Sequence, residues 1–456
     1  MITNIKENKQ GPSTFIQGPS TFIQNEGVLN IIRKRLTIRD KEKDEYGEVF
    51  TPIELICEML NMLPKDVWTD PDLKWLDPAN GIGNFPVIVY YKLMESLKGY
   101  KPKGKTLSQH IIEDMLYMVE LNQANVRECK KIFHMVDPDA KLSHIANHDF
   151  LTFNPQKEWN IDKFDVIMGN PPFHTIAGPI KRKRIWHRFV IECVTNKLNK
   201  DKYLLFIHPN GWRNVGGDYK KVFSIIQERD LQRLHMRDYN DNKKIFGGIA
   251  TNYDYYCLKN TMTNNNKTII NDIDRNEVKI DLNNYLFIPS GMFEMYDKLT
   301  KDEEKVKIIY SSNAYETRAV KSKNPINKDK TSKFIWPVVN SITQKGGIKR
   351  IWSSVKSKDM FVPKVIWSDG VGTYPILDKE GEYGLTQFSY GIQDEPKYLN
   401  DIKQAMEDPE FIELMKYVKF TNHKYNYRII GTFKKDFYKH FKGKTMQTGK
   451  EGKKNV

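Results

Sequence analysis

Residues 73–85 read Leu-Lys-Trp-Leu-Asp-Pro-Ala-Asn-Gly-Ile-Gly-Asn-Phe, and this stretch decides the fold. The apolar run Leu73–Asp77 predicts a short strand, and Phe85–Leu97 carries apolar residues at helical spacing. Between them, Gly81 and Gly83 permit a tight turn at the helix N-terminus, which offers free N–H groups. A strand, a glycine turn and a helix in this order indicate the first βα unit of a parallel sheet.

The same alternation continues to about residue 260. Six further apolar runs predict strands at Leu116–Glu120, Leu142–Ala146, Phe164–Met168, Tyr203–His208, Arg233–Tyr239 and Asn252–Leu258. Amphipathic segments predict crossover helices at Gln123–Met135, Ile185–Leu198 and Tyr219–Glu228. The expected fold class is α/β, with a doubly wound, seven-stranded, Rossmann-like sheet.

The length of the chain, 456 residues, predicts two domains because single cores rarely grow past about 250–300 residues. The first is expected at 28–260, followed by a Thr/Asn-rich linker at 261–267. Segments at 268–441 are aromatic, basic and irregular, which predicts a second domain of α+β type. Residues 1–27 hold a tandem Gly-Pro-Ser-Thr-Phe-Ile-Gln repeat and are expected to form a flexible arm, and 442–456 a basic disordered tail.

The net charge of +15, with 12% aromatic residues, favours a polyanionic partner, and the mixture of basic and aromatic side chains favours nucleic acid. The four cysteines are widely spaced, so no zinc site or redox couple is expected and a reducing compartment is the simpler inference. No apolar leader or membrane span is evident, which predicts an intracellular protein, cytoplasmic or in the nucleoid or nucleus.

Acidic residues follow three successive predicted strands. Asp77 precedes the glycine turn, Glu120 ends the second strand, and Asp149 follows the third. Each acid alone is more often a solvated loop residue, but together they converge where open α/β sheets bind ligands. Pro86 replaces the third glycine of a dinucleotide fingerprint, and Asp77 would repel a pyrophosphate. The set therefore favours a cationic cofactor, S-adenosylmethionine, over NAD.

A second motif, Asn170-Pro171-Pro172-Phe173, follows the fourth predicted strand. Two prolines fix φ and remove two N–H donors, so the loop is stiff and its carbonyls remain free as acceptors. The Asn170 amide oxygen and the Pro171 carbonyl together could accept both hydrogens of an exocyclic amine and localise its lone pair for methylation. Phe173 offers a face for stacking. The alternative for this segment alone is a strand followed by a Pro-Pro turn.

With these motifs in place, the chain resembles the amino-methylating DNA methyltransferases, specifically the N6-adenine class in which the cofactor motif comes first, the catalytic loop second and the target-recognition domain last. The resemblance covers residues 45–260 by motif and the C-terminal half by position. It implies that S-adenosylmethionine is held by Phe50, Thr51, Pro52, Asp77, Ala79, Gly81, Gly83, Phe85, Glu120, Asp149, Phe150 and Asn170.

The resemblance also implies a direct, in-line transfer with no covalent enzyme intermediate, and no metal is expected at the site. The target adenine leaves the duplex and is held between Phe173 and Phe246, and its amine attacks the sulfonium methyl directly. Cytosine-C5 methylation would need a cysteine nucleophile, whereas Cys193 lies in an amphipathic segment typical of core.

Basic residues outside the sheet motifs are candidates for the grip on double-stranded DNA. The run Lys181, Arg182, Lys183 and Arg184 follows the catalytic loop, where phosphate contact and a plain solvated loop are about equally favoured. The second domain carries Arg318, Lys321, Lys323, Lys345, Lys349, Arg350, Trp352, Lys356, Lys358 and Trp367, while Phe334–Pro337 is expected in the core and 384–391 in a strand or buried turn.

Two other functions remain open from sequence. Related catalytic loops methylate RNA or a glutamine amide, although the long basic extension favours DNA. A catalytically inactive DNA-binding subunit is the second, against which the intact motifs argue. No nuclease core is evident, so a restriction partner or a specificity subunit would be a separate protein.

Overall fold

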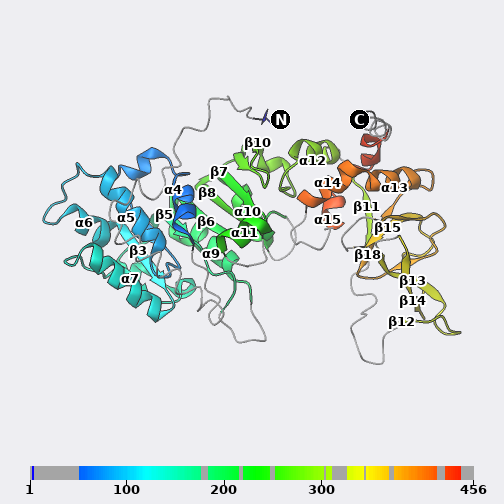
Figure 1. The fold of residues 1–456 in the computed structure, drawn as a ribbon, viewed down its shortest axis with the longest axis horizontal. Helices are drawn as coiled ribbons and strands as arrows, with labels where there is room; N and C mark the ends of the chain where they lie inside the picture. The colour runs from blue at the N-terminus through cyan, green and yellow to red at the C-terminus, as the bar shows by residue number, and fades with distance from the viewer. Residues whose placement is uncertain are drawn as a thin grey trace, which may run out of the picture. The chain divides into compact units, whose positions relative to one another are not determined.

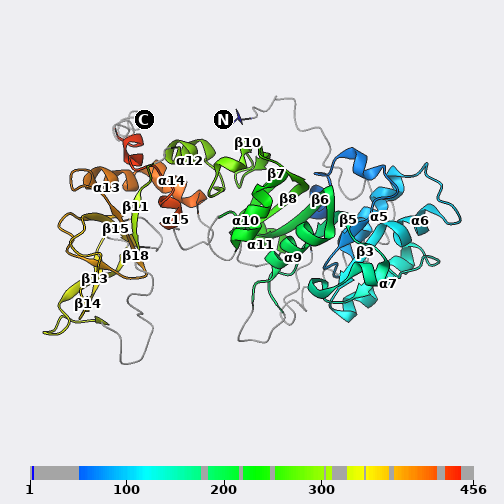
Figure 2. The ribbon, with the colours of Figure 1, turned by 180° about the vertical axis from the view of Figure 1, so that it is seen from behind.

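The structure is a computed structural model that describes residues 3–4, 51–175, 183–214, 219–246, 252–301, 304–310, 326–343, 346–368, 374–418 and 427–442. The chain forms two compact units, Met1–Leu286 and Phe287–Val456 (Figures 1 and 2).

The first unit is built on one large sheet with strand order β1-β10-β9-β7-β8-β6-β5-β2-β3-β4. Neighbouring strands from β4 to β6 run parallel, and β8 lies antiparallel between β6 and β7. Seven strands correspond to the predicted ones, which confirms the doubly wound α/β class: β2 (Trp75–Asp77), β3 (Leu116–Glu120), β4 (Ile145–Asn147), β5 (Phe164–Gly169), β6 (Leu198–Pro209), β7 (Arg229–Arg237) and β8 (Tyr253–Met262).

Helices lie between these strands in sequence. The apolar spacing of Ile53, Ile56 and Leu60 produces α4, whose inward face is buried in the core. Asn122 caps α7 by accepting from the Ala124 N–H at 2.9 Å. The helices among the described residues of this unit are α4 (Ile53–Leu60), α5 (Asn84–Ser96), α6 (Leu107–His110), α7 (Gln123–Val136), α8 (Pro155–Trp159), α9 (Trp186–Glu192), α10 (Lys220–Gln227) and α11 (Tyr239–Phe246).

The sheet continues past the predicted domain boundary. Strand β9 (Lys267–Asn271) pairs parallel with β7, β10 (Glu277–Asp281) pairs with β9, and β1 (Thr3–Asn4) pairs with β10. The segment predicted as a linker is a connection closed by the buried Asn266, whose side chain donates to three carbonyls and accepts from the Leu231 N–H. The first unit therefore extends to Leu286 and not to residue 260.

The second unit combines two four-stranded sheets with helices. One sheet has the order β11-β18-β15-β16 and the other the order β12-β14-β13-β17. Its elements are α12 (Phe293–Thr300), β11 (Lys307–Tyr310), β12 (Ile326–Asn327), β13 (Trp336–Ile342), β14 (Ile348–Ser353), β15 (Lys364–Ser368), β16 (Ile376–Asp378), β17 (Gly384–Leu385), β18 (Ser389–Gln393), α13 (Leu399–Glu407), α14 (Pro409–Tyr417) and α15 (Tyr427–Ile430).

Two expectations for the second unit need correction. Trp367 is fully buried in β15 and belongs to the core, not to a basic surface. Conversely, Ile335 is 43% exposed and Trp336 is half-buried, so the segment predicted as core lies at the surface. Apolar and basic residues alternate in these segments, so the sequence alone does not separate core positions from surface positions.

All four cysteines are buried and free, which agrees with a core position for Cys193. In the described ranges, no helix has both the length and the apolar character needed to cross a membrane.

Candidate active site

Three motif residues gather at the carboxyl edge of the sheet. Strand β2 lies between β3 and β5, and these strands end in Asp77, Glu120 and the residue before Asn170. Gly169 allows the end of β5 to pack closely against the end of β2. It has φ +146°, and a Cβ there would lie 2.8 Å from Asp77 Oδ1. A glycine is therefore required immediately before the catalytic loop.

The glycine turn is tied to the second acid. Gly81 N–H donates to Glu120 Oε2 at 2.9 Å, and Asn122 N–H donates to Glu120 Oε1 at 2.7 Å. Gly83 has φ +96°, and a Cβ there would meet Cys129 Sγ at 2.8 Å. The loop is thus fixed before any ligand binds, with one acceptor site on each Glu120 oxygen already used.

The electrostatics of this edge suit a cationic ligand. Asp77 is 1% exposed, and burial raises its pKa well above the usual range; the Ala79 N–H partly opposes this shift, while the Glu120 carboxylate adds to it. Among the described residues, the buried amide oxygens of Asn80 and Asn84 have no hydrogen-bond partner. Acidic and acceptor groups concentrated in this way fit the ammonium and sulfonium groups of S-adenosylmethionine.

Thr51 connects the glycine turn to the catalytic loop. Its hydroxyl accepts a hydrogen bond from Asn170 Nδ2 at 3.2 Å, and its carbonyl accepts from Asn84 Nδ2 at 3.3 Å. Thr51 is 4% exposed and stands just before Pro52, the N-cap residue of α4. The amide nitrogen of Asn170 is therefore directed toward Thr51, which turns the amide oxygen away from it.

The catalytic loop is held by the chain that returns to it. Ile185 N–H donates to the Phe173 carbonyl at 3.1 Å, and Thr175 N–H donates to the Lys183 carbonyl at 2.8 Å. Within the tetrapeptide, Pro171 is buried, Pro172 is exposed and Phe173 is partly exposed.

The described half of the basic run lies beside this loop. Lys183 and Arg184 belong to the segment that returns to this loop. The Lys183 carbonyl accepts from the Thr175 N–H, and Arg184 donates to the Tyr219 hydroxyl at 3.2 Å. Lys181 and Arg182 lie outside the described residues, as does Phe50.

The remaining predicted residues occupy different environments. Asp149 is exposed and its Oδ1 accepts from the Leu151 N–H at 3.0 Å, while Phe150 is buried with its ring stacked on Phe189 at 5.4 Å. Phe85 is buried in the core, and Phe246 is 4% exposed with its ring edge-on to Tyr253 at 5.4 Å. In this structure the two aromatic candidates differ: Phe173 is partly exposed and Phe246 is buried.

Sequence reasoning missed several residues of this edge. It gave no role to Asn84, Gly169 or Tyr219, and it assigned Thr51 to the cofactor alone. Only Gly169 carried a usable signal, since a glycine between a buried strand and a Pro-Pro loop indicates close packing.

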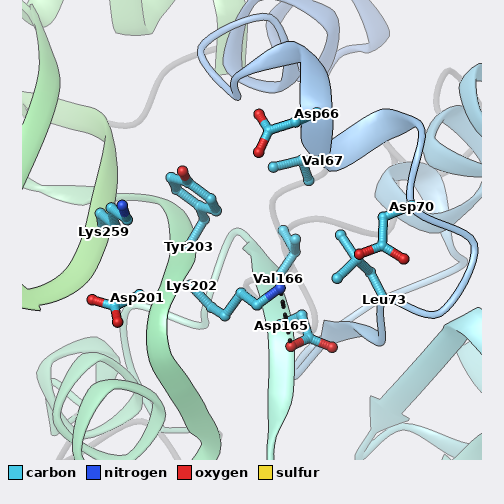
Figure 3. Close-up of a pocket in the computed structure, with 10 residues that line it drawn as sticks. All are labelled: Asp66, Val67, Asp70, Leu73, Asp165, Val166, Asp201, Lys202, Tyr203 and Lys259. Carbon is cyan, nitrogen blue, oxygen red and sulfur yellow. Dashed lines mark ion pairs between the residues drawn. The ribbon is translucent and has the colours of Figure 1, made fainter.

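A pocket of about 160 Å³ lies at the opposite edge of the sheet, near the start of β5 (Figure 3). Lys202 Nζ reaches Asp165 Oδ1 at 3.6 Å across it. Asn170 is separated from this pocket by the length of β5, so the pocket is not the candidate active site. Its lining is Asp66, Val67, Asp70, Leu73, Asp165, Val166, Asp201, Lys202, Tyr203 and Lys259.

Comparisons with known proteins show which family and which proteins the chain is similar to. Residues 36–210 match the sequence profile of the family described as N-6 DNA Methylase. An uncharacterized adenine-specific methylase of Mycoplasma pneumoniae is 25% identical over 304 residues, covering 49% of this chain and 69% of that protein. Modification methylase CviBIII of Paramecium bursaria Chlorella virus NC1A is 25% identical over 213 residues, covering 45% and 48%.

A modification subunit of a putative type I restriction enzyme from Vibrio vulnificus has a TM-score of 0.40 and 14% identity, covering 54% of this chain and 52% of that one. The chain thus spans about half the length of two of these three proteins.

The sheet order, the strand-end acids and the glycine turn define the class of Rossmann-like methyltransferases, for which S-adenosylmethionine is the implied cofactor. Within that class, residues 36–210 match the N-6 DNA methylase family.

Proposed function

We propose that this chain is a site-specific DNA adenine-N6 methyltransferase, the modification component of a restriction-modification system. One observation carries the proposal: the Asn170 side chain is oriented by Thr51 at the end of β5, beside the buried acid Asp77. An amide acceptor next to a cation-binding edge is what transfer of a methyl group to a weakly nucleophilic amine requires.

Asn170 and Pro171 act on the amine. The adenine amino nitrogen is a poor nucleophile because its lone pair is delocalised into the ring. Asn170 Oδ1 and the Pro171 carbonyl accept its two hydrogens, which localises the lone pair on nitrogen. Their positions are set before substrate arrives, by Thr51 on one side and the φ restriction of the prolines on the other.

The cofactor residues hold the donor. S-adenosylmethionine supplies, when bound, a methyl group on a positively charged sulfur. Asp77, Glu120 and the amide oxygens of Asn80 and Asn84 form its acceptor-rich cradle, and Asp149 keeps one oxygen for a donor group because only Oδ1 caps Leu151.

Aromatic rings hold the extruded base. Phe173 is partly exposed at the end of the catalytic loop and offers one face. Phe246 is the second ring of the proposal, and its use requires the end of α11 to release it from Tyr253. Base–aromatic stacking is worth about 1–3 kcal/mol per base, enough to offset part of an unstacking cost of a few kcal/mol.

The experiment that tests the substrate class presents methyl-labelled cofactor with duplex DNA, RNA and protein extract in parallel. The proposal expects label in DNA, recovered as N6-methyladenine after digestion. Label only in RNA or at a glutamine amide would favour the related N-methyltransferases, and cofactor binding without transfer would favour an inactive DNA-binding subunit.

A further inference from the structure

The lysines of the second unit fall into two groups that sequence does not separate. On and next to the helices, lysines pair with carboxylates, for example Lys403 with Glu407 on α13 and Lys416 with Glu413 on α14. Lys439 likewise pairs with Asp436. These charges are neutralised within the unit and contribute little to the attraction of a distant polyanion.

The segment around β12, β13 and β14 is different. Residues 326–361 contain eight lysines and arginines and only two aspartates. One of the two, Asp359, is buried. In the described part of this segment, no carboxylate pairs with any of the exposed cations, which are Lys328, Lys330, Lys333, Lys349, Arg350, Lys356 and Lys358.

Aromatic rings take the place of carboxylates as neighbours of these cations. Lys330 Nζ lies 5.2 Å from the centre of the Trp352 ring, and Lys356 Nζ lies 4.3 Å from that of Phe361. Lys356 is also 5.9 Å from the Trp336 ring. A ring face holds a cation weakly and keeps its positive charge, so the ammonium groups remain available to a phosphate.

The same segment carries exposed apolar groups. Phe361 is 60% exposed, Val355 59% and Ile335 43%. Within the second unit, Figures 1 and 2 both place β13 and β14 at the end away from α13 and α14, and β12 pairs with β14. Cations without carboxylate partners, half-exposed rings and apolar side chains thus occupy one end of the unit and ion-paired lysines the other. We call the first group, residues 326–361, the cationic sheet end.

We propose that the cationic sheet end is the surface by which the second unit grips duplex DNA, with its lysines and Arg350 on phosphates and the exposed Phe361 ring in apolar contact with the duplex. The inference rests on the proposed function. It assigns the grip to this end alone, although lysines are spread through the whole unit.

The test compares two triple variants of the full chain that remove the same charge. Lys330→Gln, Lys349→Gln and Lys356→Gln alter the cationic sheet end, whereas Lys403→Gln, Lys416→Gln and Lys439→Gln alter the ion-paired end. Duplex affinity is measured against salt concentration. Removing one lysine that binds a phosphate should reduce the slope of log affinity against log salt by about 0.9. The first variant is expected to reduce it by up to that amount per lysine, and the second to leave it unchanged.

Equal effects of the two variants would overturn the inference, because the grip would then be a property of net charge. A third variant with arginine at positions 330, 349 and 356 keeps the charge and should keep the slope, which separates weaker phosphate binding from misfolding. Vesicles containing phosphatidylserine are the second arm: a variant that loses vesicle binding but keeps DNA binding would assign the surface to a membrane.

If the unmodified chain binds no duplex at all, the proposed function fails. If it binds and the two triple variants behave alike, only this inference fails.

Discussion

Thr51 and Asn170 are 119 residues apart in the chain, yet one hydrogen bond between their side chains sets the direction of the amide in the catalytic loop. An amide has two similar ends, and only the oxygen can accept a hydrogen from the target amine. The Thr51 hydroxyl fixes the orientation of the amide because it accepts a hydrogen bond from Asn170 Nδ2. Thr51 is therefore a positioning residue for the proposed reaction.

Replacing Thr51 by valine should lower kcat, because the valine keeps the shape and removes the acceptor. A hydrogen bond worth about 0.5–1.5 kcal/mol corresponds to a reduction of roughly 2- to 10-fold. Thr51→Ser retains the hydroxyl and is the matched control, with kcat close to that of the unmodified chain. A valine variant with full kcat, or a serine variant as slow as valine, would remove Thr51 from this role.

Among residues, the sequence predicted which strand-end side chains lie at one edge of the sheet. Asp77, Glu120 and Asn170 follow strands that could be recognised, so their meeting at one edge was predictable. The Thr51 contact was not, because nothing local indicates that a side chain ahead of α4 reaches the loop after β5. Phe246 shows the other limit: its type suits stacking, but its burial against Tyr253 depends on tertiary packing.

Helix α4 begins two residues after Thr51, and a network of charged and polar side chains links it to the sheet. Glu58 on α4 accepts from Arg237 Nη2 of β7 at 3.1 Å and from the Tyr255 hydroxyl of β8. Arg237 also donates to Asn271 of β9 at 2.9 Å. Burial opposes ionisation of Glu58, but hydrogen bonds from His235 and Tyr255 and the charge of Arg237 prevail and lower its pKa from 4.5 to about 2.

The lowered pKa predicts a pH dependence of stability. A carboxyl group whose pKa falls on folding stabilises the fold fully above its unfolded value, and this contribution is lost as pH decreases through the folded value. For Glu58 the window runs from about 4.5 down to about 2. The free energy of unfolding, measured by urea titration across this window, should fall less steeply in Glu58→Gln than in the unmodified chain.

Glu54→Gln removes the same charge from the exposed start of the same helix and is the control, with an unchanged slope. If the free energy of unfolding falls equally steeply with pH in the unmodified chain and in Glu58→Gln, the network does not stabilise the packing of α4 on the sheet.

Among elements, strands and helices with strong apolar periodicity were predicted within a few residues, as for β3 and α7. Strands β9 and β10 were missed because the segment that leads from β8 to β9 is rich in Thr and Asn, a composition typical of linkers. The deciding feature is the burial of Asn266, which replaces an apolar anchor by hydrogen bonds to backbone groups.

For the whole molecule, the boundary between the units predicts how stable two truncated chains should be. A chain ending at Leu286 keeps the full sheet, whereas one ending at Asn260 lacks β9 and β10 and exposes the edge of β7. The missing part includes the buried side chains Ile270, Val278 and Ile280. Burial of each of these side chains contributes about 1.5 kcal/mol or more to stability. The shorter chain should therefore melt roughly 10 °C lower than the longer one.

Thermal unfolding followed by circular dichroism measures the difference. Equal melting temperatures for the two truncated chains would mean that β9 and β10 add nothing to the first unit, and would restore the boundary near residue 260 expected from sequence.

In the proposed reaction, Asn170 activates an adenine amine in DNA beside the bound cofactor. The most direct measurement is single-turnover transfer of a labelled methyl group to duplex DNA by the unmodified chain and by Asn170→Ala, with the S-adenosylmethionine affinity of each determined by calorimetry. We expect Asn170→Ala to be slower by about 100-fold or more, the scale seen when a preorganised polar group is removed, with little change in cofactor affinity. An Asn170→Ala variant that retains most of its transfer rate would contradict it.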